Sequence, residues 1–344
     1  MQIAYWLRLV RMTNNFGELN LSKSTGYTER RKAPDATASD EGSILPMDRL
    51  GLYSDKAISV ARGFVDVIVN TVPMQKAIDW VNRAQQLVDV LDIPRCLVIA
   101  GPPGVGKTSF ARYICRKLND GHPLSEGTRA LYLRLAPRST AFTITSELLT
   151  QLRCPFTRVT ENVYPIRRAA LVESCRAVDT RMIIIDEAHN MLSHHRTRSE
   201  EAAGISTISD LVCTLVDQAG VGVVLAGRET LYGLTDFDAA LGSRVESTVD
   251  FPLWSDPKRF IQVLAAMTSK VDHHCSLAYL RESQTAARLH AESRGNPRAL
   301  KRIVTEGILV AVTDGASALL DAHLSLALER LASSAHASVT KVAA

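Results

Sequence analysis

The chain has 344 residues, of which 46% are hydrophobic, and its 40 Lys and Arg against 36 Asp and Glu give a formal net charge of +4. These values suit one large globular domain or two smaller ones. No apolar run approaches the roughly 20 residues that a membrane-spanning helix needs, which excludes a predicted membrane anchor. The near balance of charge neither requires nor excludes a nucleic-acid partner. Evidence for such a partner must come from local clusters of basic residues.

The N-terminal region and the cysteines bear on cellular setting. Residues 1–12 contain Arg8 and Arg11 and lack a small-residue cleavage site, so we do not interpret them as a signal peptide. The six cysteines are scattered without a CxxC pair, which predicts a reduced, cytoplasmic location. Residues 13–43 are polar and without period, and we predict a flexible arm over residues 1–45.

Short apolar runs and helical stretches alternate through the middle of the chain. Apolar residues at helical spacing predict a helix within 74–91, and the strands that we expect after it cover residues 96–100, 130–135, 182–186, 221–227 and 247–251. This alternation is typical of a parallel sheet covered on both faces. We therefore predict an α/β domain over residues 46–252 with a five-stranded parallel sheet.

The strands stop after Pro252, and the remaining patterns are helical. Ser255 or Asp256 can cap the first of these helices, with Pro257 in its first turn. Further helical patterns cover residues 276–294, 296–312 and 316–332. We predict a small helical domain over residues 253–332 and a disordered tail over 333–344.

The sequence "GPPGVGKTS" follows the first predicted strand directly and precedes a helix. It matches G-x-x-x-x-G-K-[ST] in the strand–loop–helix context that this phosphate-binding loop requires. Its glycines let backbone N–H groups turn towards phosphates, Lys107 can reach the β- and γ-phosphates, and Thr108 can offer its hydroxyl to Mg²⁺. We expect nucleotide contacts from Gly101, Pro102, Pro103, Gly104, Val105, Gly106, Lys107, Thr108 and Ser109.

The third predicted strand ends in two acids, Asp186 and Glu187. Asp186 would complete the Mg²⁺ shell, and Glu187 would polarise the attacking water. The letters D-E-A-H also occur in helicases, but the residues after Pro252 do not repeat the strand–helix alternation that a second motor domain needs. The histidines at 189, 194 and 195, and the trio His273, His274 and Cys275, lack the spacing of a metal site.

Three arginines complete the predicted site. Arg228, with Thr230 as the alternative, follows the fourth strand and can help place the hydrolytic water. Arg244 precedes the fifth strand and can reach the γ-phosphate in a neighbouring subunit as an arginine finger; the alternative is a surface arginine paired with Glu246. Arg298, near a helix start in the small domain, can fold back onto the phosphates.

The order of these motifs resembles that of the AAA+ ATPases of DNA transposition, the TniB and TnsC family, with a looser likeness to the Mu phage B protein. The resemblance covers roughly Val72 to Val312 and rests on "GPPGVGKT", "IIIDEAHNML", "ISDLVCTLVDQAGVGVVLAG" and especially "GSRVESTVDFPLW". The family carries Thr or Asn after the glycine of the fourth strand, where this chain has Arg228. The N-terminal arm is poorly matched.

The resemblance implies an ATP- and Mg²⁺-dependent protein that forms rings or filaments on double-stranded DNA, recruits or activates a transposase, and dissociates as ATP is hydrolysed. Loops after the second strand face the pore in ring ATPases, which makes nearby arginines candidate ligands for DNA phosphates. These are Arg134, Arg138, Arg158, Arg167 and Arg168. The alternatives are a replication initiator or loader and a signalling ATPase, although an appended winged-helix domain or sensor repeats are not evident.

Overall fold

The computed structural model describes residues 53–120, 129–154, 164–193, 208–271 and 275–340, and residues 51–344 form one compact unit. Its centre is a sheet of five parallel strands in the order β2-β3-β4-β1-β5. The strands are β1 (Cys96–Ala100), β2 (Ala130–Arg134), β3 (Met182–Asp186), β4 (Gly222–Ala226) and β5 (Val245–Asp250). The five predicted strands are confirmed, with ends that differ by at most two residues.

Alternate strand residues supply two separate hydrophobic cores. Leu97 and Ile99 of β1 pack on one face of the sheet, against helices α3 (Val72–Leu91) and α4 (Lys107–Asn119). Cys96 and Val98 pack on the other face. That face is covered by α5 (Ala141–Gln151), α6 (Tyr164–Ala177) and α8 (Ile208–Asp217). Because β1, β3 and β4 are buried along their whole length, they read as continuous apolar runs in the sequence.

The parallel register brings the carboxyl ends of the strands to one edge of the sheet. Asp186 of β3 lies opposite Arg134 of β2 and Ala226 of β4, and Ala100 of β1 lies opposite Asp250 of β5. Ligands bind outside the carboxyl ends of strands in open α/β sheets. Two short elements follow β3 and β4 at this edge, η3 (Ala188–Ser193) and η4 (Glu229–Gly233). After η4, α9 (Leu234–Phe237) and α10 (Ala239–Gly242) lead back to the start of β5 at the amino edge.

The C-terminal residues form a helical group with its own hydrophobic core. Its elements are α11 (Pro257–Thr268), η5 (Ala278–Arg281), α12 (Ser283–Ser293), α13 (Pro297–Thr313) and α14 (Asp321–Thr340). Asp256 caps α11 by accepting from the Lys258 N–H, which decides between the two predicted caps. The predicted helix over residues 276–294 is instead divided between η5 and α12, and α14 begins later than predicted.

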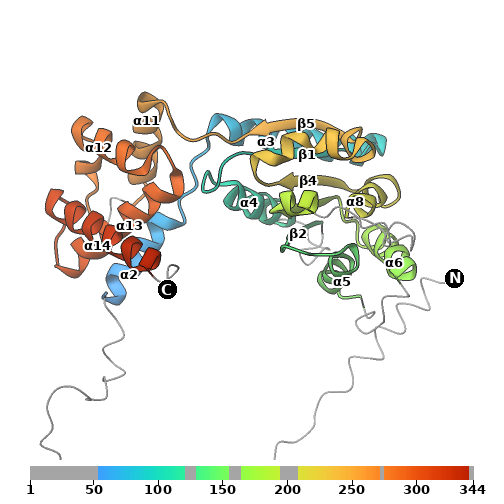
Figure 1. The fold of residues 1–344 in the computed structure, drawn as a ribbon, viewed down its shortest axis with the longest axis horizontal. Coiled ribbons are helices and arrows are strands. Elements are labelled where there is room, and N and C mark those ends of the chain that lie inside the picture. The colour runs from blue at the N-terminus through green and yellow to red at the C-terminus, as the bar shows by residue number, and fades with distance from the viewer. Residues whose placement is uncertain (1–52, 121–128, 155–163, 194–207, 272–274, 341–344) are drawn as a thin grey trace, which may run out of the picture. The chain divides into compact units, whose positions relative to one another are not determined.

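Helix α2 (Asp55–Val65) was not predicted and belongs to this helical group. Ala57, Val60, Ala61 and Phe64 lie in the same core as Phe260 of α11. Figure 1 shows α2 beside α13, although more than 200 residues separate them in sequence. The first part of the predicted 46–252 domain thus packs with the C-terminal helices, and the other predicted domain limits stay predictions. In the described part of the chain, no helix is both long and apolar enough to span a membrane.

Candidate active site

The phosphate-binding loop connects β1 to α4 and depends on its glycines. Gly101, Gly104 and Gly106 have φ values of 150°, 90° and 101°, which other residues adopt at a cost. A Cβ atom on Gly101 would lie 2.3 Å from the Phe251 carbonyl oxygen, so that backbone approach also requires glycine. Because α4 begins directly after Gly106, its first N–H groups face the loop and form a site for anions.

Lys107 lies inside the loop and is 9% exposed. Its ammonium group donates to the carbonyl oxygens of Gly101 and Pro102, each at 2.7 Å. Burial lowers the pKa of Lys107, while the carboxylates of Glu187 and Asp186 oppose this shift. Lys107 therefore places a positive charge inside the loop, and its contact with the phosphates stays a prediction.

Asp186, at the end of β3, is 2% exposed and accepts two hydrogen bonds. The Tyr132 hydroxyl donates to Oδ2 at 2.9 Å, and the Glu187 N–H donates to Oδ1 at 3.0 Å. Burial and the Asp186 charge raise the pKa of Tyr132, so the phenol remains a donor. The sequence did not single out Tyr132, because a tyrosine within an apolar strand reads as part of the core. A buried, hydrogen-bonded carboxylate beside the loop is a donor group suited to Mg²⁺.

Glu187 is held between two basic side chains. Its φ of 56° is unusual for a residue other than glycine and turns the chain as it leaves β3. Arg134 lies 3.4 Å from Oε1, and His189 Nδ1 lies 3.5 Å from Oε2. Burial is the main reason that the pKa of His189 is lowered. Arg134 was predicted to contact DNA, but this structure places it beside Glu187 in a cavity that Lys107 and Asp186 also line.

At Gly227, the segment that follows β4 lies close to the segment that follows β3. A Cβ atom there would lie 2.9 Å from the His189 backbone nitrogen, which explains the glycine. Arg228 follows at the N-cap position of η4 and lines the same cavity as Lys107 and Glu187. No group of His, Cys, Asp and Glu in the described residues could hold a metal by itself. His194, His195, His273 and His274 lie outside these residues.

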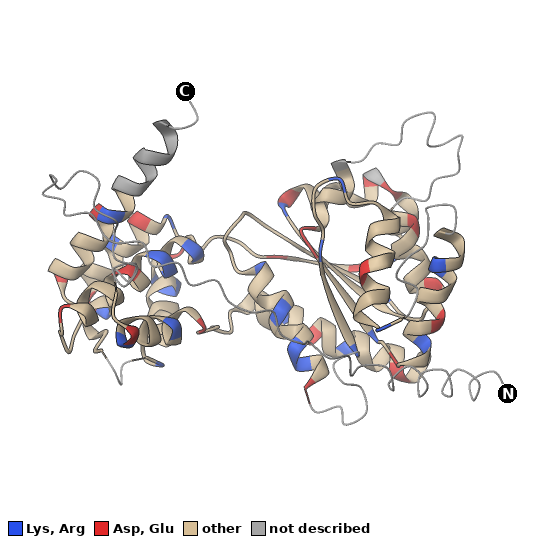
Figure 2. Ribbon diagram, turned by 90° about the horizontal axis from the view of Figure 1, so that it is seen from below, with Lys and Arg blue, Asp and Glu red and all other residues tan. Residues whose placement is uncertain are grey.

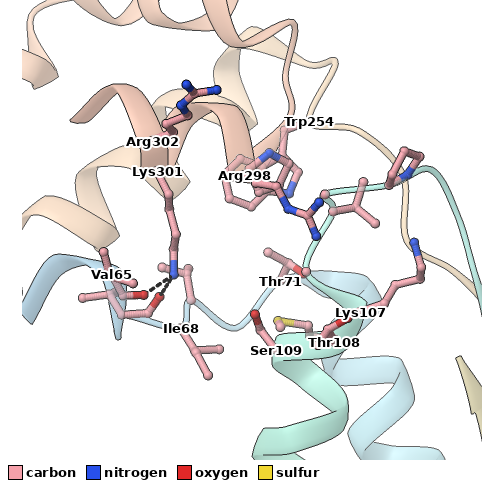
Figure 3. Close-up of a pocket in the computed structure, with 18 of the residues that line it drawn as sticks. Val65, Ile68, Thr71, Lys107, Thr108, Ser109, Trp254, Arg298, Lys301 and Arg302 are labelled. Atoms are coloured by element: carbon pink, nitrogen blue, oxygen red, sulfur yellow. Dashed lines mark hydrogen bonds between the residues drawn. The ribbon is translucent and has the colours of Figure 1, made fainter. Parts of the chain in front are cut away.

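The helical group supplies the opposite wall of the cavity, whose volume is about 890 Å³. Asn296 caps α13 and also donates from Nδ2 to the Pro103 carbonyl oxygen at 3.0 Å. The Arg298 N–H donates to the Gly104 carbonyl oxygen at 3.1 Å. Figure 3 shows the Arg298 side chain extending from α13 towards the loop that contains Lys107. Arg298 thus lies near the phosphate loop, and its predicted contact with the phosphates stays a prediction.

An apolar stretch between α2 and α3 lines the rest of the cavity. Val67, Ile68 and Val69 of this stretch face it, together with Met74 of α3 and Trp254 from the segment after β5. Lys301 of α13 fixes this stretch by donating to the carbonyl oxygens of Val65 and Val67, both at 2.7 Å, as Figure 3 shows. An apolar wall beside a phosphate loop suits a nucleotide base. Sequence reasoning missed Val67, Ile68, Val69 and Met74 because they belong to no recognised motif. Trp254 ends the motif "GSRVESTVDFPLW", but the sequence did not assign it to the nucleotide site.

Arg244 lies at the opposite edge of the sheet. It precedes β5, and its carbonyl oxygen accepts from the Cys96 N–H at the start of β1. The five residues of β1 separate this point from the phosphate loop by roughly 17 Å, which a side chain cannot span. Arg244 pairs with Asp217, whereas Glu246, the alternative partner in the sequence, pairs with Arg83 at 3.1 Å.

The candidate DNA residues have different surroundings. Arg138 is exposed, with a φ of 64° in the turn after β2, and Arg168 is half-buried on α6. Arg167 is 3% exposed, donates to the Ser146 hydroxyl at 2.6 Å and lies over the Phe142 ring. This burial contradicts the predicted DNA contact by Arg167. Arg158 lies outside the described residues. In the view of Figure 2, Lys and Arg are interspersed with Asp and Glu along the described elements.

A family model, described as "Bacterial TniB protein", matches residues 68–256. The chain belongs to the TniB family. The match includes the phosphate loop, Asp186, Glu187 and Arg244, and it ends just after Trp254. Comparison with curated proteins found no significant match. As a TniB protein with this phosphate loop and paired acids, the chain is a P-loop ATPase.

Solved structures of low sequence identity share the fold of this TniB protein. The ORC1 protein of Aeropyrum pernix, in complex with DNA, has 17% identity and a TM-score of 0.57 over 79% of this chain and 68% of its own. The ORC2 protein of the same organism, with ADPNP and ADP, has 16% identity and a TM-score of 0.55 over 81% and 72%. Cdc6p of Pyrobaculum aerophilum has 17% identity and a TM-score of 0.52 over 75% and 67%. The predicted AAA+ core with a helical domain is confirmed.

Proposed function

We propose that this TniB protein assembles on double-stranded DNA in its ATP-bound form, recruits or activates a transposase there, and leaves the DNA as ATP is hydrolysed. The observation that carries the proposal is the division of the site between two edges of one sheet. Lys107, Asp186 and Glu187 lie at the carboxyl edge, whereas Arg244 lies roughly 17 Å away at the amino edge. The carboxyl edge supplies the nucleotide site, and the amino edge supplies the arginine for the γ-phosphate of a neighbouring subunit.

This division favours head-to-tail assembly. If Arg244 of one subunit reaches the nucleotide of the next, the same contact repeats along the assembly. Such heterologous interfaces form rings when the rotation closes and helical filaments when it does not. Hydrolysis would then require assembly, because Arg244 cannot reach the nucleotide of its own subunit.

The residues at the carboxyl edge have complementary roles in the proposed reaction. The loop N–H groups and Lys107 bind the phosphates, and Arg298 adds positive charge from the helical group. Thr108 and the buried Asp186 would hold Mg²⁺, which supplies charge neutralisation at the β- and γ-phosphates when bound. Glu187 orients and polarises water for attack. Contact of Glu187 with Arg134 and His189 restrains the carboxylate before nucleotide and water are aligned.

Sequence-independent contacts to DNA phosphates fit Arg138, which is exposed, and Arg168, which is half-buried. Arg138 is in a turn beside Ser139 and Thr140, and Arg168 is on the neighbouring helix α6. Individually these side chains are weak ligands, but an assembly repeats them in every subunit. We therefore expect DNA affinity to depend on the nucleotide that drives assembly.

Sedimentation of the protein on a long duplex tests this proposal. With a non-hydrolysable ATP analogue, wild-type protein should form large complexes on DNA, and these should bind a partner transposase. With ADP, or in the Lys107→Ala variant, the complexes should be absent. Complexes of equal size with ATP analogue and ADP would contradict nucleotide-dependent assembly. Assembled protein that does not bind the transposase would contradict the proposed recruitment.

A further inference from the structure

The guanidinium group of Arg244 is held on two sides by its own subunit. Nε donates to Oδ1 of Asp217 at 2.9 Å, and Nη2 donates to Oδ2 at 2.5 Å. Nη1 donates to the carbonyl oxygen of Ala240. The paired bonds to one carboxylate fix the plane of the guanidinium as well as its position. The Arg244 backbone is also fixed, because its carbonyl oxygen accepts from Cys96 at 2.9 Å.

This arrangement leaves part of the guanidinium available to another molecule. An arginine side chain carries five N–H donors, and the three bonds to Asp217 and Ala240 use one each on Nε, Nη1 and Nη2. One donor therefore remains on Nη1 and one on Nη2. The side chain is 24% exposed, so a phosphate of a neighbouring subunit could approach it.

The ion pair between Arg244 and Asp217 contributes little to the stability of the fold. The Asp217 side chain is 48% exposed, and ion pairs between exposed side chains contribute little to folding because water screens them. Hydrogen bonding to Arg244 is the main cause that lowers the pKa of Asp217, which keeps the carboxylate charged throughout the neutral range. The ordering of a long side chain at a surface has an entropic cost, which a functional arginine recovers when it binds already oriented.

We propose that Asp217 is a positioning residue, which orients Arg244 so that its remaining N–H donors meet the γ-phosphate bound in the adjacent subunit. The inference rests on the proposed trans role of Arg244. Asp217 ends helix α8 and Arg244 directly precedes β5, so the contact ties the arginine to two elements of the core.

Mixed assemblies test this inference, because they separate the subunit that gives the arginine from the subunit that receives it. The reference mixture combines Arg244→Ala protein, which keeps an intact nucleotide site, with Lys107→Ala protein, which keeps an intact Arg244. ATP turnover is measured after co-assembly on DNA is verified. Asp217→Ala is then added to one subunit type at a time, and Asp217→Asn repeats the test with a side chain of similar size.

Asp217→Ala in the Lys107→Ala subunit should lower turnover of the mixture on the order of tenfold, the loss of a hydrogen bond to a charged group. The same change in the Arg244→Ala subunit should have no effect, because that subunit contributes no arginine. Glu246→Ala in the Lys107→Ala subunit is the matched control, since it breaks the adjacent ion pair with Arg83 and should leave turnover unchanged.

Equal loss from Asp217→Ala in either subunit would show a structural role and overturn the inference, as would unchanged turnover with the substitution in the Lys107→Ala subunit. A reference mixture that co-assembles but hydrolyses no ATP would instead refute the trans role of Arg244, and with it the positioning role of Asp217.

Discussion

Tyr132→Phe removes a single hydroxyl group that donates to the buried carboxylate of Asp186. The bond is 2.9 Å long and the carboxylate is 2% exposed, so water cannot easily replace the lost donor. Only the Glu187 N–H would still donate to this carboxylate among the described residues. A buried hydrogen bond to a charged group contributes about 1.5–3 kcal/mol, and we expect a loss of unfolding free energy of that size. Loss of such an orienting partner lowers metal affinity by about 10- to 100-fold.

Two assays measure these effects of Tyr132→Phe. Denaturant unfolding without nucleotide gives the change in stability, and titration of Mg²⁺ into the protein with an ATP analogue gives the change in metal dependence. Tyr113→Phe on α4 is the matched control, because its hydroxyl makes no hydrogen bond within the described residues. Identical Mg²⁺ dependence in wild type and Tyr132→Phe would refute the idea that Tyr132 orients Asp186 for metal binding.

Further substitutions test single groups at the carboxyl edge. Lys107→Ala should abolish nucleotide binding by calorimetry, and equal affinity in both proteins would remove Lys107 from the site. Glu187→Gln should bind ATP but lower steady-state turnover by about 10²- to 10⁴-fold, so an unchanged rate would argue against a water-activating role. Arg134→Gln should alter ATP turnover yet leave the salt dependence of DNA binding unchanged. A flatter salt dependence would show that Arg134 contacts DNA phosphates. Gly101→Ala should destabilise the protein in denaturant unfolding more than Gly106→Ala, because only the first meets a backbone atom at 2.3 Å.

The strands and the phosphate loop could be predicted because their signals are local. Each of the strands β1, β3 and β4 is an uninterrupted apolar run, and the loop needs glycines at fixed spacing before a lysine. Helix α2 could not be placed in this way. Its partners, including Phe260 and Ile303, are about 200 residues distant, and nothing in its own eleven residues indicates which core they join.

The arginines show a second limit of sequence reasoning. Arg134, Arg138 and Arg167 look alike as basic residues near the second strand and α6, yet their surroundings differ. The register of β2 with β3 brings Arg134 next to Glu187, and helix packing buries Arg167 against Phe142. Spacing along the chain predicts neither result, because each depends on contacts between elements that are separate in sequence.

The most direct test of the proposed function is fluorescence anisotropy of several duplexes of unrelated sequence, titrated with protein over a range of salt concentrations. With an ATP analogue, we expect similar affinities for all duplexes and a steep fall in affinity as salt rises, because every subunit contributes phosphate contacts. Arg138→Ala should flatten that dependence. With ADP, binding should be lost. Binding that is equally tight with ADP, or that is confined to one sequence, would contradict an ATPase that assembles on DNA through its phosphate backbone.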